Sequence, residues 1–101
     1  MTTPSTPLCQ TQVVPASAAA KVGATGVRRL WKAVLYPAAA NSIVEFKNGA
    51  TDTGDVLLTL SAIANGHSVE CDLTSVGGLS FGTAMFCKPA GTGSICYVWY
   101  S

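Results

Sequence analysis

The stretch Ser94-Ile-Cys-Tyr-Val-Trp-Tyr100 predicts the fold more clearly than any other part of the chain. It is rich in β-branched and aromatic residues, which favour strands. Alternate side chains of a strand point to opposite faces. Both faces of this one are apolar, with Ile95, Tyr97 and Trp99 on one and Cys96, Val98 and Tyr100 on the other. Such a strand is either central and covered on both sides, or it lies at an interface between subunits.

A second stretch with the same property spans Val27–Tyr36. A regular strand would place Leu30, Val34 and Tyr36 on one face and Trp31, Ala33 and Leu35 on the other. Two strands that are apolar on both faces exceed what the core of one small sandwich can absorb. We therefore expect part of this apolar surface to be covered by other subunits.

Two further stretches alternate between apolar and polar residues, as strands with one wet face do. The inward set comprises Val69, Cys71 and Leu73 in one stretch and Val44 and Phe46 in the other, and the outward set comprises Ser68, Glu70, Asp72, Glu45 and Lys47.

Turn residues separate the strand-like stretches at short, regular intervals, and no segment has the apolar spacing of a helix. This pattern predicts an all-β fold, namely an antiparallel β-sandwich of about seven strands with jelly-roll or immunoglobulin-like topology. The sandwich is expected over residues 12–101, after an extended N-terminal arm over residues 1–11. The expected strands are Gln12–Val22, Val27–Tyr36, Ser42–Lys47, Val56–Ser61, Ser68–Leu73, Leu79–Lys88 and Ser94–Tyr100.

Charge is scarce in this chain. Only 11% of the 101 residues are charged, against about 25% in ordinary soluble domains, and the net charge is +1. A near-balanced charge provides no long-range attraction for nucleic acid or an anionic membrane, and it does little to keep copies apart. Residues 1–23 lack the features of a secretory signal, and no apolar run is long enough to span a bilayer. We therefore expect self-association, with neither nucleic acid nor a membrane as partner.

The four cysteines show no metal-binding spacing, and His67 is the only histidine. Without a secretory signal, the thiols are expected to remain free in a reducing cytosol. If the last two strands form a hairpin around Gly91 and Thr92, Cys87 lies opposite Cys96. A disulfide between them is one interpretation. The favoured interpretation is that they are two small side chains packed in the core without a bond between them.

No residue pattern indicates catalysis, so we expect no enzyme activity and no cofactor. His67 follows Asn65-Gly66 at a predicted turn, and the five acids form no evident catalytic pair. The segment Asp52-Thr-Gly-Asp55 has oxygen ligands but lacks the length of a calcium-binding loop. A turn in which the Asp side chains bond to nearby backbone N–H groups is the better explanation.

The segment Arg28-Arg-Leu-Trp-Lys32 combines basic and aromatic residues, as nucleic-acid binders do. Strand alternation would split them between two faces, which leaves no basic platform. Large aromatic residues dominate the energetics of protein interfaces, although core packing is the competing role. The candidate interface residues are Arg28, Trp31, Lys32, Tyr97, Trp99 and Tyr100.

Three segments carry a resemblance to a known group of proteins. They are Asn48-Gly-Ala-Thr-Asp-Thr-Gly-Asp-Val-Leu-Leu-Thr-Leu60, Gly77-Gly-Leu-Ser-Phe-Gly82 and Tyr97-Val-Trp-Tyr-Ser101. Their order of strands, turns and aromatic terminus, over about Val27 to Ser101, resembles the small β-sandwich virion proteins of tailed bacteriophages, including those that infect cyanobacteria.

This resemblance implies a capsid decoration (cement) protein on the exterior of the virion, assembled in the host cytoplasm. The implied partners are the phage major capsid protein and further copies of the chain, in a homo-oligomer such as a trimer. A tail, neck or head-fibre component is an alternative. A different alternative, from the aromatic residues themselves, is a carbohydrate-binding module that stacks sugars on Trp31, Trp99 or Tyr100.

Overall fold

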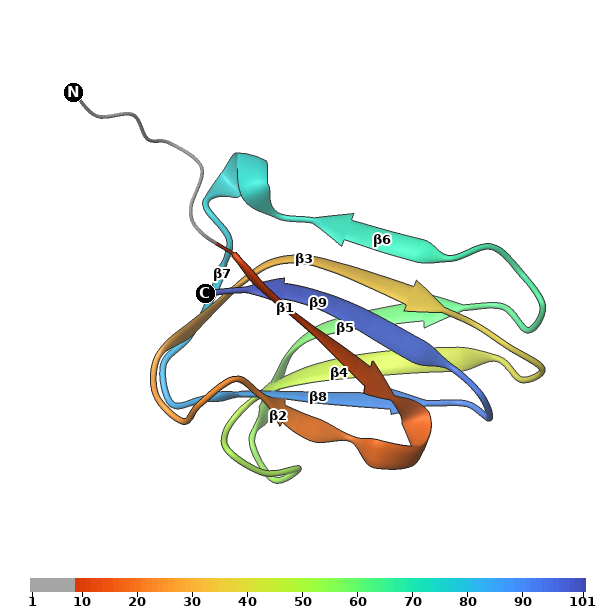
Figure 1. Cartoon of the computed structure of the whole chain (residues 1–101), viewed down its shortest axis with the longest axis horizontal. Coiled ribbons are helices and arrows are strands. Elements are labelled where there is room, and N and C mark those ends of the chain that lie inside the picture. Colours follow the sequence, from red (N-terminus) through yellow and green to blue (C-terminus); the bar gives the residue numbers. More distant parts are fainter. Residues whose placement is uncertain (1–8) are drawn as a thin grey trace.

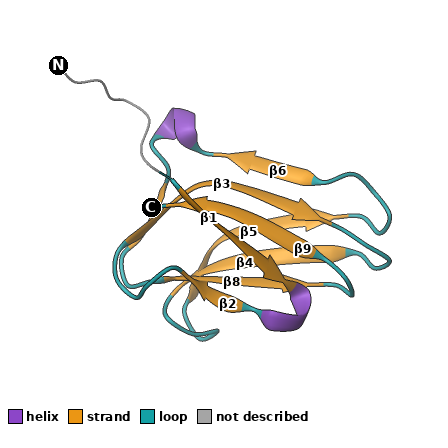
Figure 2. Cartoon of the chain, viewed as in Figure 1, coloured by secondary structure: helices purple, strands orange, loops and turns teal. Residues whose placement is uncertain are grey.

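The computed structural model describes residues 9–101 and consists of two antiparallel β-sheets packed face to face (Figure 1). Strands and short connecting turns make up this part of the chain, together with two single-turn 3₁₀ helices (Figure 2). The elements are β1 Gln10–Pro15, η1 Ala16–Ala18, β2 Ala20–Val22, β3 Arg28–Tyr36, β4 Ser42–Asn48, β5 Asp55–Ala62, β6 Val69–Asp72, η2 Thr74–Val76, β7 Leu79–Phe81, β8 Met85–Ala90 and β9 Ile95–Tyr100.

The strand order is that of a jelly roll. Sheet A has the order β1-β9-β3-β6, with β7 also paired to β3, and sheet B has the order β2-β8-β4-β5. Thus β1 pairs with β9, β2 with β8, β3 with β6, and β4 with β5. A long hairpin rolled around itself has this pairing. The predicted β-sandwich is confirmed.

Two of the predicted strands are each divided between the sheets. Gln12–Val22 forms β1 in sheet A, turns through η1 and continues as β2 in sheet B. Leu79–Lys88 likewise forms β7 in sheet A and β8 in sheet B. The backbone between β7 and β8 is bonded to other loops, because Thr83 accepts from the N–H of Gly26 and its own N–H donates to the Asn48 side chain.

The predicted hairpin between the last two strands is wrong. β8 belongs to sheet B and β9 to sheet A, so the turn between them crosses the sandwich. Gly91 has φ +112°, and a Cβ there would lie 2.6 Å from the backbone oxygen of Asn41, so this turn requires glycine. Cys87 therefore pairs with Phe46 and Ala20 along the ladders, and not with Cys96.

The inward faces of both sheets form one hydrophobic core. The outward placement of Glu70 and Asp72 is confirmed, as is the burial of Val44 and Phe46. The fully buried larger side chains are Phe46, Phe81, Leu30, Leu35, Met85, Val14, Val22, Val44 and Val98.

A bulge in β3 changes the predicted facing of its residues. Leu30 pairs with Tyr100 and Lys32 with Trp99, which leaves Trp31 as an extra residue without a partner on β9. The extra residue reverses the alternation, so Leu30, Ala33 and Leu35 are buried inside. Lys32, Val34 and Tyr36 then share the outer face. Alternation alone could not place this irregularity.

The predicted boundary of the N-terminal arm also differs from the structure. Residues 1–8 of the arm lie outside the described residues, but β1 already begins at Gln10. The Gln10 side chain accepts a hydrogen bond from the Tyr100 hydroxyl at 3.0 Å. Within residues 9–101, neither helical turn has the length or the apolar character needed to cross a bilayer.

Candidate binding surface on the outer face of sheet A

The outer face of sheet A collects apolar side chains from three adjacent strands. Val13 of β1, Tyr97 of β9 and Val34 of β3 lie side by side in one row of the sheet. A second row joins Ile95 to Tyr36. We call the set Val13, Val34, Tyr36, Ile95, Tyr97 and Trp99 the aromatic face.

This face is accessible in the single chain. Val13 is 52% exposed, Tyr36 48% and Tyr97 38%, while Val34 lies buried beneath its neighbours. The rings of Tyr36 and Tyr97 meet edge to face, with centroids 5.2 Å apart and planes at 66°. Such a pair is held in a defined geometry and presents apolar area with polar tips, which suits a protein contact.

Charged side chains border the aromatic face and are balanced in sign. The ammonium of Lys32 lies 5.2 Å from the centre of the Trp99 ring and 3.1 Å from the Glu70 carboxylate. The guanidinium of Arg29 lies 5.8 Å from the Trp31 ring and donates to the Gly77 carbonyl at 2.7 Å. These contacts position the cations over the indole rings.

A fourth charge near this border belongs to Asp72, which is aligned with Lys32 across the β3–β6 pair. Hydrogen bonds from the Thr74 side chain and backbone hold the pKa of Asp72 below its ordinary value. Two basic residues, Arg29 and Lys32, therefore meet two acidic ones, Glu70 and Asp72, at this border.

The predicted interface residues are only partly brought together. Lys32, Tyr97 and Trp99 lie on the outer side of sheet A, and Trp31 lies at the bulge, where its indole N–H donates to the Ser101 hydroxyl at 3.0 Å. The other two predicted residues are placed differently.

Tyr100 points into the core and is almost fully buried, so it is not part of the aromatic face. Arg28 lies where β3 pairs with β7, and its buried Nε has no hydrogen-bond partner within the described residues. The prediction omitted Val13, because the sequence does not show that β1 pairs with β9. Residues 10–15 do not alternate between polar and apolar side chains, so the sequence holds no local signal that marks Val13, rather than Val14, as outward-facing.

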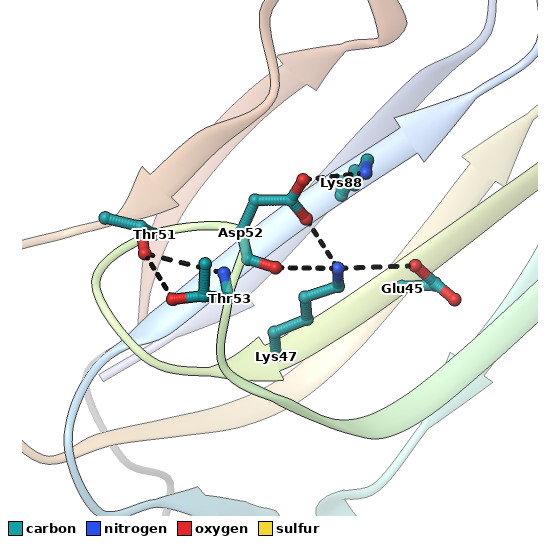
Figure 3. A network of polar contacts seen from close by, with 6 residues as sticks. All are labelled: Glu45, Lys47, Thr51, Asp52, Thr53 and Lys88. Carbon is teal, nitrogen blue, oxygen red and sulfur yellow. Dashed lines mark hydrogen bonds and ion pairs between the residues drawn. The ribbon is translucent and has the colours of Figure 1, made fainter.

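The outer face of sheet B has a different character, because a charged network covers part of it (Figure 3). Asp52 accepts hydrogen bonds from the ammonium groups of Lys47 and Lys88, the latter at 2.8 Å. Glu45 lies 3.7 Å from Lys47. The Lys47 side chain is only 11% exposed, so its predicted place on a wet face needs correction: the loop after β4 folds over it.

The same network revises the interpretation of Asp52-Thr-Gly-Asp55. The Asp52 carboxylate bonds to two lysines rather than to nearby backbone N–H groups. It is Thr51 whose hydroxyl accepts from the Thr53 N–H, at 3.5 Å. The loop is therefore held to sheet B by ion pairs. Within residues 9–101, no group of three or more His, Cys, Asp or Glu side chains is arranged to hold a metal ion.

Replacing Asp52 with asparagine is expected to loosen the loop and lower the thermal stability. Hydrogen bonds from Lys47 and then Lys88 hold the pKa of Asp52 below 3.8, and the bond to Asp52 raises the pKa of Lys47 above 10.5. The ionised Asp52 carboxylate stabilises the folded state fully at pH values above its pKa in the unfolded chain. This stabilisation is lost as the pH falls through the lower pKa that Asp52 has in the folded protein. The Lys47 ammonium stabilises the folded state fully below pH 10.5. This stabilisation is lost as the pH rises through the higher pKa that Lys47 has in the folded protein.

The difference in melting temperature between wild type and Asp52→Asn should thus be greatest from about pH 5 to 9 and shrink toward either extreme. Thermal unfolding across pH, with amide exchange over residues 49–54, measures both effects. Asp55→Asn is the control, because Asp55 forms no ion pair within the described part of the chain. Equal effects of the two substitutions would contradict the role assigned to Asp52.

Two hollows lie at the end of the sandwich where β4 begins and β8 ends. The first, of about 380 Å³, is lined by three polar and three apolar residues, namely Asn41, Ser42, Ser61, Ile43, Ala62 and Ile63. The second, of about 520 Å³, includes Lys88 in its lining. His67 is exposed on the loop between β5 and β6. The aromatic face is the more distinctive surface, since it combines exposed large side chains with a fixed, charged border.

None of the known protein-family models matches this sequence, and a search of the curated proteins finds no significant match either. The fold, the aromatic face and the resemblance of the turn and strand segments are therefore the features that bear on function.

Proposed function

We propose that this protein is a non-enzymatic structural protein of a tailed bacteriophage, which decorates and stabilises the exterior of the capsid as a homo-oligomer. The observation that carries the proposal is the aromatic face, where Val13, Tyr36 and Tyr97 are exposed beside one another. Contiguous apolar surface of this kind on a small domain marks a contact with another macromolecule.

The charge balance of the border favours a second copy of the chain as the occupant of this face. Arg29 and Lys32 offset Glu70 and Asp72, and the whole chain carries only +1. A face with no net charge does not repel its own copy, and its mixed charges can pair across the contact. This supports self-association over binding to a strongly charged partner.

The size of the face predicts a weak pairwise contact. A sheet of four strands about 4.8 Å apart, each about six residues long, covers roughly 400 Å². That is about half of the roughly 800 Å² that each partner buries in a standard stable complex. Closed symmetry, in a trimer for example, and simultaneous binding to the major capsid protein would repeat the contact and raise the avidity.

The jelly-roll topology is compatible with this role but does not select it. Jelly rolls occur in viral capsid domains, and also in lectins and cupins. Fold by itself does not imply function. The virion assignment comes from the resemblance of three segments, among them 48–60 and 77–82, and a tail, neck or head-fibre position would use the same self-associating sandwich.

Binding to phage heads tests the proposal. Heads that lack the protein should take up added protein and withstand a higher temperature before they rupture. Tyr97→Asp should reduce both uptake and protection, whereas Leu57→Asp, a similarly exposed residue on β5 of sheet B, should leave them unchanged. Failure of the wild-type protein to bind any heads of its parent phage would reject the decoration role.

A carbohydrate-binding module remains the second candidate, because exposed aromatic residues on a β-sheet can stack on sugar rings. The 66° angle between Tyr36 and Tyr97 does not provide one flat platform, and cations already lie over Trp31 and Trp99. Specific binding on a glycan array that disappears in Trp99→Ala would favour this candidate over the structural one.

A further inference from the structure

The chain contains two Asn-Gly pairs, Asn48-Gly49 and Asn65-Gly66, and the fold places them in different surroundings. An Asn-Gly pair can modify itself, because the backbone nitrogen of the glycine can attack the side-chain carbonyl carbon of the asparagine. Glycine has no side chain to shield that nitrogen. Whether the reaction takes place in a folded protein depends on how firmly the two reacting groups are held.

Both reacting groups of the first pair are held by sheet B and the loops around it. The Asn48 side-chain oxygen accepts a hydrogen bond from the Thr83 N–H at 2.9 Å. The Gly49 N–H donates to the Ala84 carbonyl at 3.0 Å. Asn48 is the last residue of β4 and is paired there with both β5 and β8. Freeing the Gly49 nitrogen therefore requires this end of the sheet to open.

The second pair lies in an exposed turn of the loop between β5 and β6, at the right-hand end of the sandwich in Figure 1. In the part of the chain that the structure describes, no hydrogen bond fixes the Asn65 side-chain amide. The Gly66 N–H donates to the Ile63 carbonyl at 2.9 Å, within the same turn. Exposed loops open at a much lower free-energy cost than paired strands. The Gly66 nitrogen therefore becomes free without disturbing either sheet.

We propose that Asn65 is a self-modification site, which converts to aspartate and isoaspartate in the folded protein while Asn48 persists. Hydroxide takes the Gly66 amide proton, and the nitrogen attacks the Asn65 side-chain carbonyl carbon. A C–N bond forms to give a cyclic imide, the bond to the side-chain nitrogen breaks, and ammonia leaves with a proton from water.

Water then opens the imide at one of its two carbonyl carbons. Breaking the bond between the Gly66 nitrogen and the side-chain carbon gives aspartate. Breaking the bond between that nitrogen and the main-chain carbon of residue 65 gives isoaspartate. The net change is hydrolysis of one amide by one water, with release of one ammonia, and nothing is oxidised or reduced.

The modification changes both the charge and the backbone of this loop. One neutral amide becomes one carboxylate, so the formal net charge falls from +1 to 0. Isoaspartate also adds a methylene group to the main chain beside the Asn65 N–H, which donates to the Ala38 carbonyl at 2.8 Å. The Ala64 N–H donates to the Asn41 side chain, also at 2.8 Å. Isoaspartate should therefore loosen the contact between residues 63–68 and the loop after β3, and this inference does not depend on the proposed function.

Peptide mapping by mass tests the inference on wild-type protein incubated in mildly alkaline buffer at physiological temperature. In the folded protein, the peptide with Asn65 should gain the mass difference between an amide and an acid at least about tenfold faster than the peptide with Asn48. In guanidinium chloride the two peptides should react at similar rates, because each asparagine then precedes an unprotected glycine. The rate at Asn65 should rise with pH, since the Gly66 nitrogen must lose its proton.

Asn65→Gly is the matched variant. Asn65 has a left-handed φ of +55°, which glycine adopts without strain, and glycine lacks the side-chain amide. This variant should remain as stable as wild type and show no mass change in the peptide that contains residue 65. Amide hydrogen exchange provides an independent readout, because the Gly66 N–H should exchange faster than the Gly49 N–H.

Two outcomes would overturn the inference. One is equal reaction at Asn48 and Asn65 in the folded protein, since that would mean that the end of β4 does not protect Asn48. The other is an unmodified Asn65 in folded protein after a time in which it reacts in guanidinium chloride. That result would mean that the hydrogen bond from Gly66 to Ile63 keeps the turn closed.

Discussion

Replacing Tyr97 with aspartate is expected to abolish self-association while leaving the sandwich folded. Tyr97 lies at the centre of the aromatic face, between Val13 and Val34 and against the Tyr36 ring. A carboxylate there would be buried without a partner in any contact made by this face. Loss of a central aromatic anchor costs about 2–4 kcal/mol, so the association constant should fall by roughly 30- to 1,000-fold.

Sedimentation or light scattering over a range of protein concentrations measures this loss. Leu57→Asp is the matched control, since Leu57 is 42% exposed, close to the 38% of Tyr97, but lies on the edge strand of the other sheet. Unfolding curves of both variants should remain near that of wild type, because neither side chain belongs to the core. A wild-type chain that stays monomeric at every accessible concentration would remove the basis for assembly through this face.

Replacing Phe46 with alanine is expected to produce the largest loss of stability. Phe46 lies in the middle of β4, is fully buried, and has Leu58 and Cys87 as its cross-strand neighbours. Truncation of a buried phenylalanine removes about 3–5 kcal/mol from the free energy of unfolding. Since domains of this size are stable by only about 5–15 kcal/mol, the melting temperature should fall by about 12 °C or more.

Urea unfolding gives this free energy, and the chain contains a control of the same chemistry. Phe86 lies on the neighbouring strand β8, opposite Lys47, and its side chain points to the outer face of sheet B, where it is half-buried. Phe86→Ala should cost less than half as much as Phe46→Ala. If both substitutions lowered the free energy of unfolding equally, the inner face of β4 would not be the more deeply buried one.

Much of the fold could be predicted because burial leaves a periodic signal in the sequence. The alternation around Glu70 and Asp72 identified an outer face correctly, and the burial of Val44 and Phe46 followed from the same rule. Each of these features depends on residues two positions apart on one strand. These features can therefore be predicted from one strand alone, without knowing which strands it pairs with.

Features that depend on several strands at once were not predictable. The extra residue at Trp31 satisfies the local pattern equally well in either register, and pairing with β9 selects one of them. The turn at 91–94 resembles a hairpin in sequence, yet it crosses between the sheets, which places Cys87 in sheet B and Cys96 in sheet A. Lys47 has the composition of a solvent-facing residue, and the folded loop with Asp52 covers it.

The sequence by itself determined that the chain forms a two-layer β-sandwich in which two strands are apolar on both faces. It could do so because strand alternation and turn residues are local properties. Only the tertiary structure decided which of those faces is exposed. Strand order joined Val13, Tyr97 and Tyr36 on one surface and buried Tyr100 within the core, since neighbours in a jelly roll are set by pairing between distant segments.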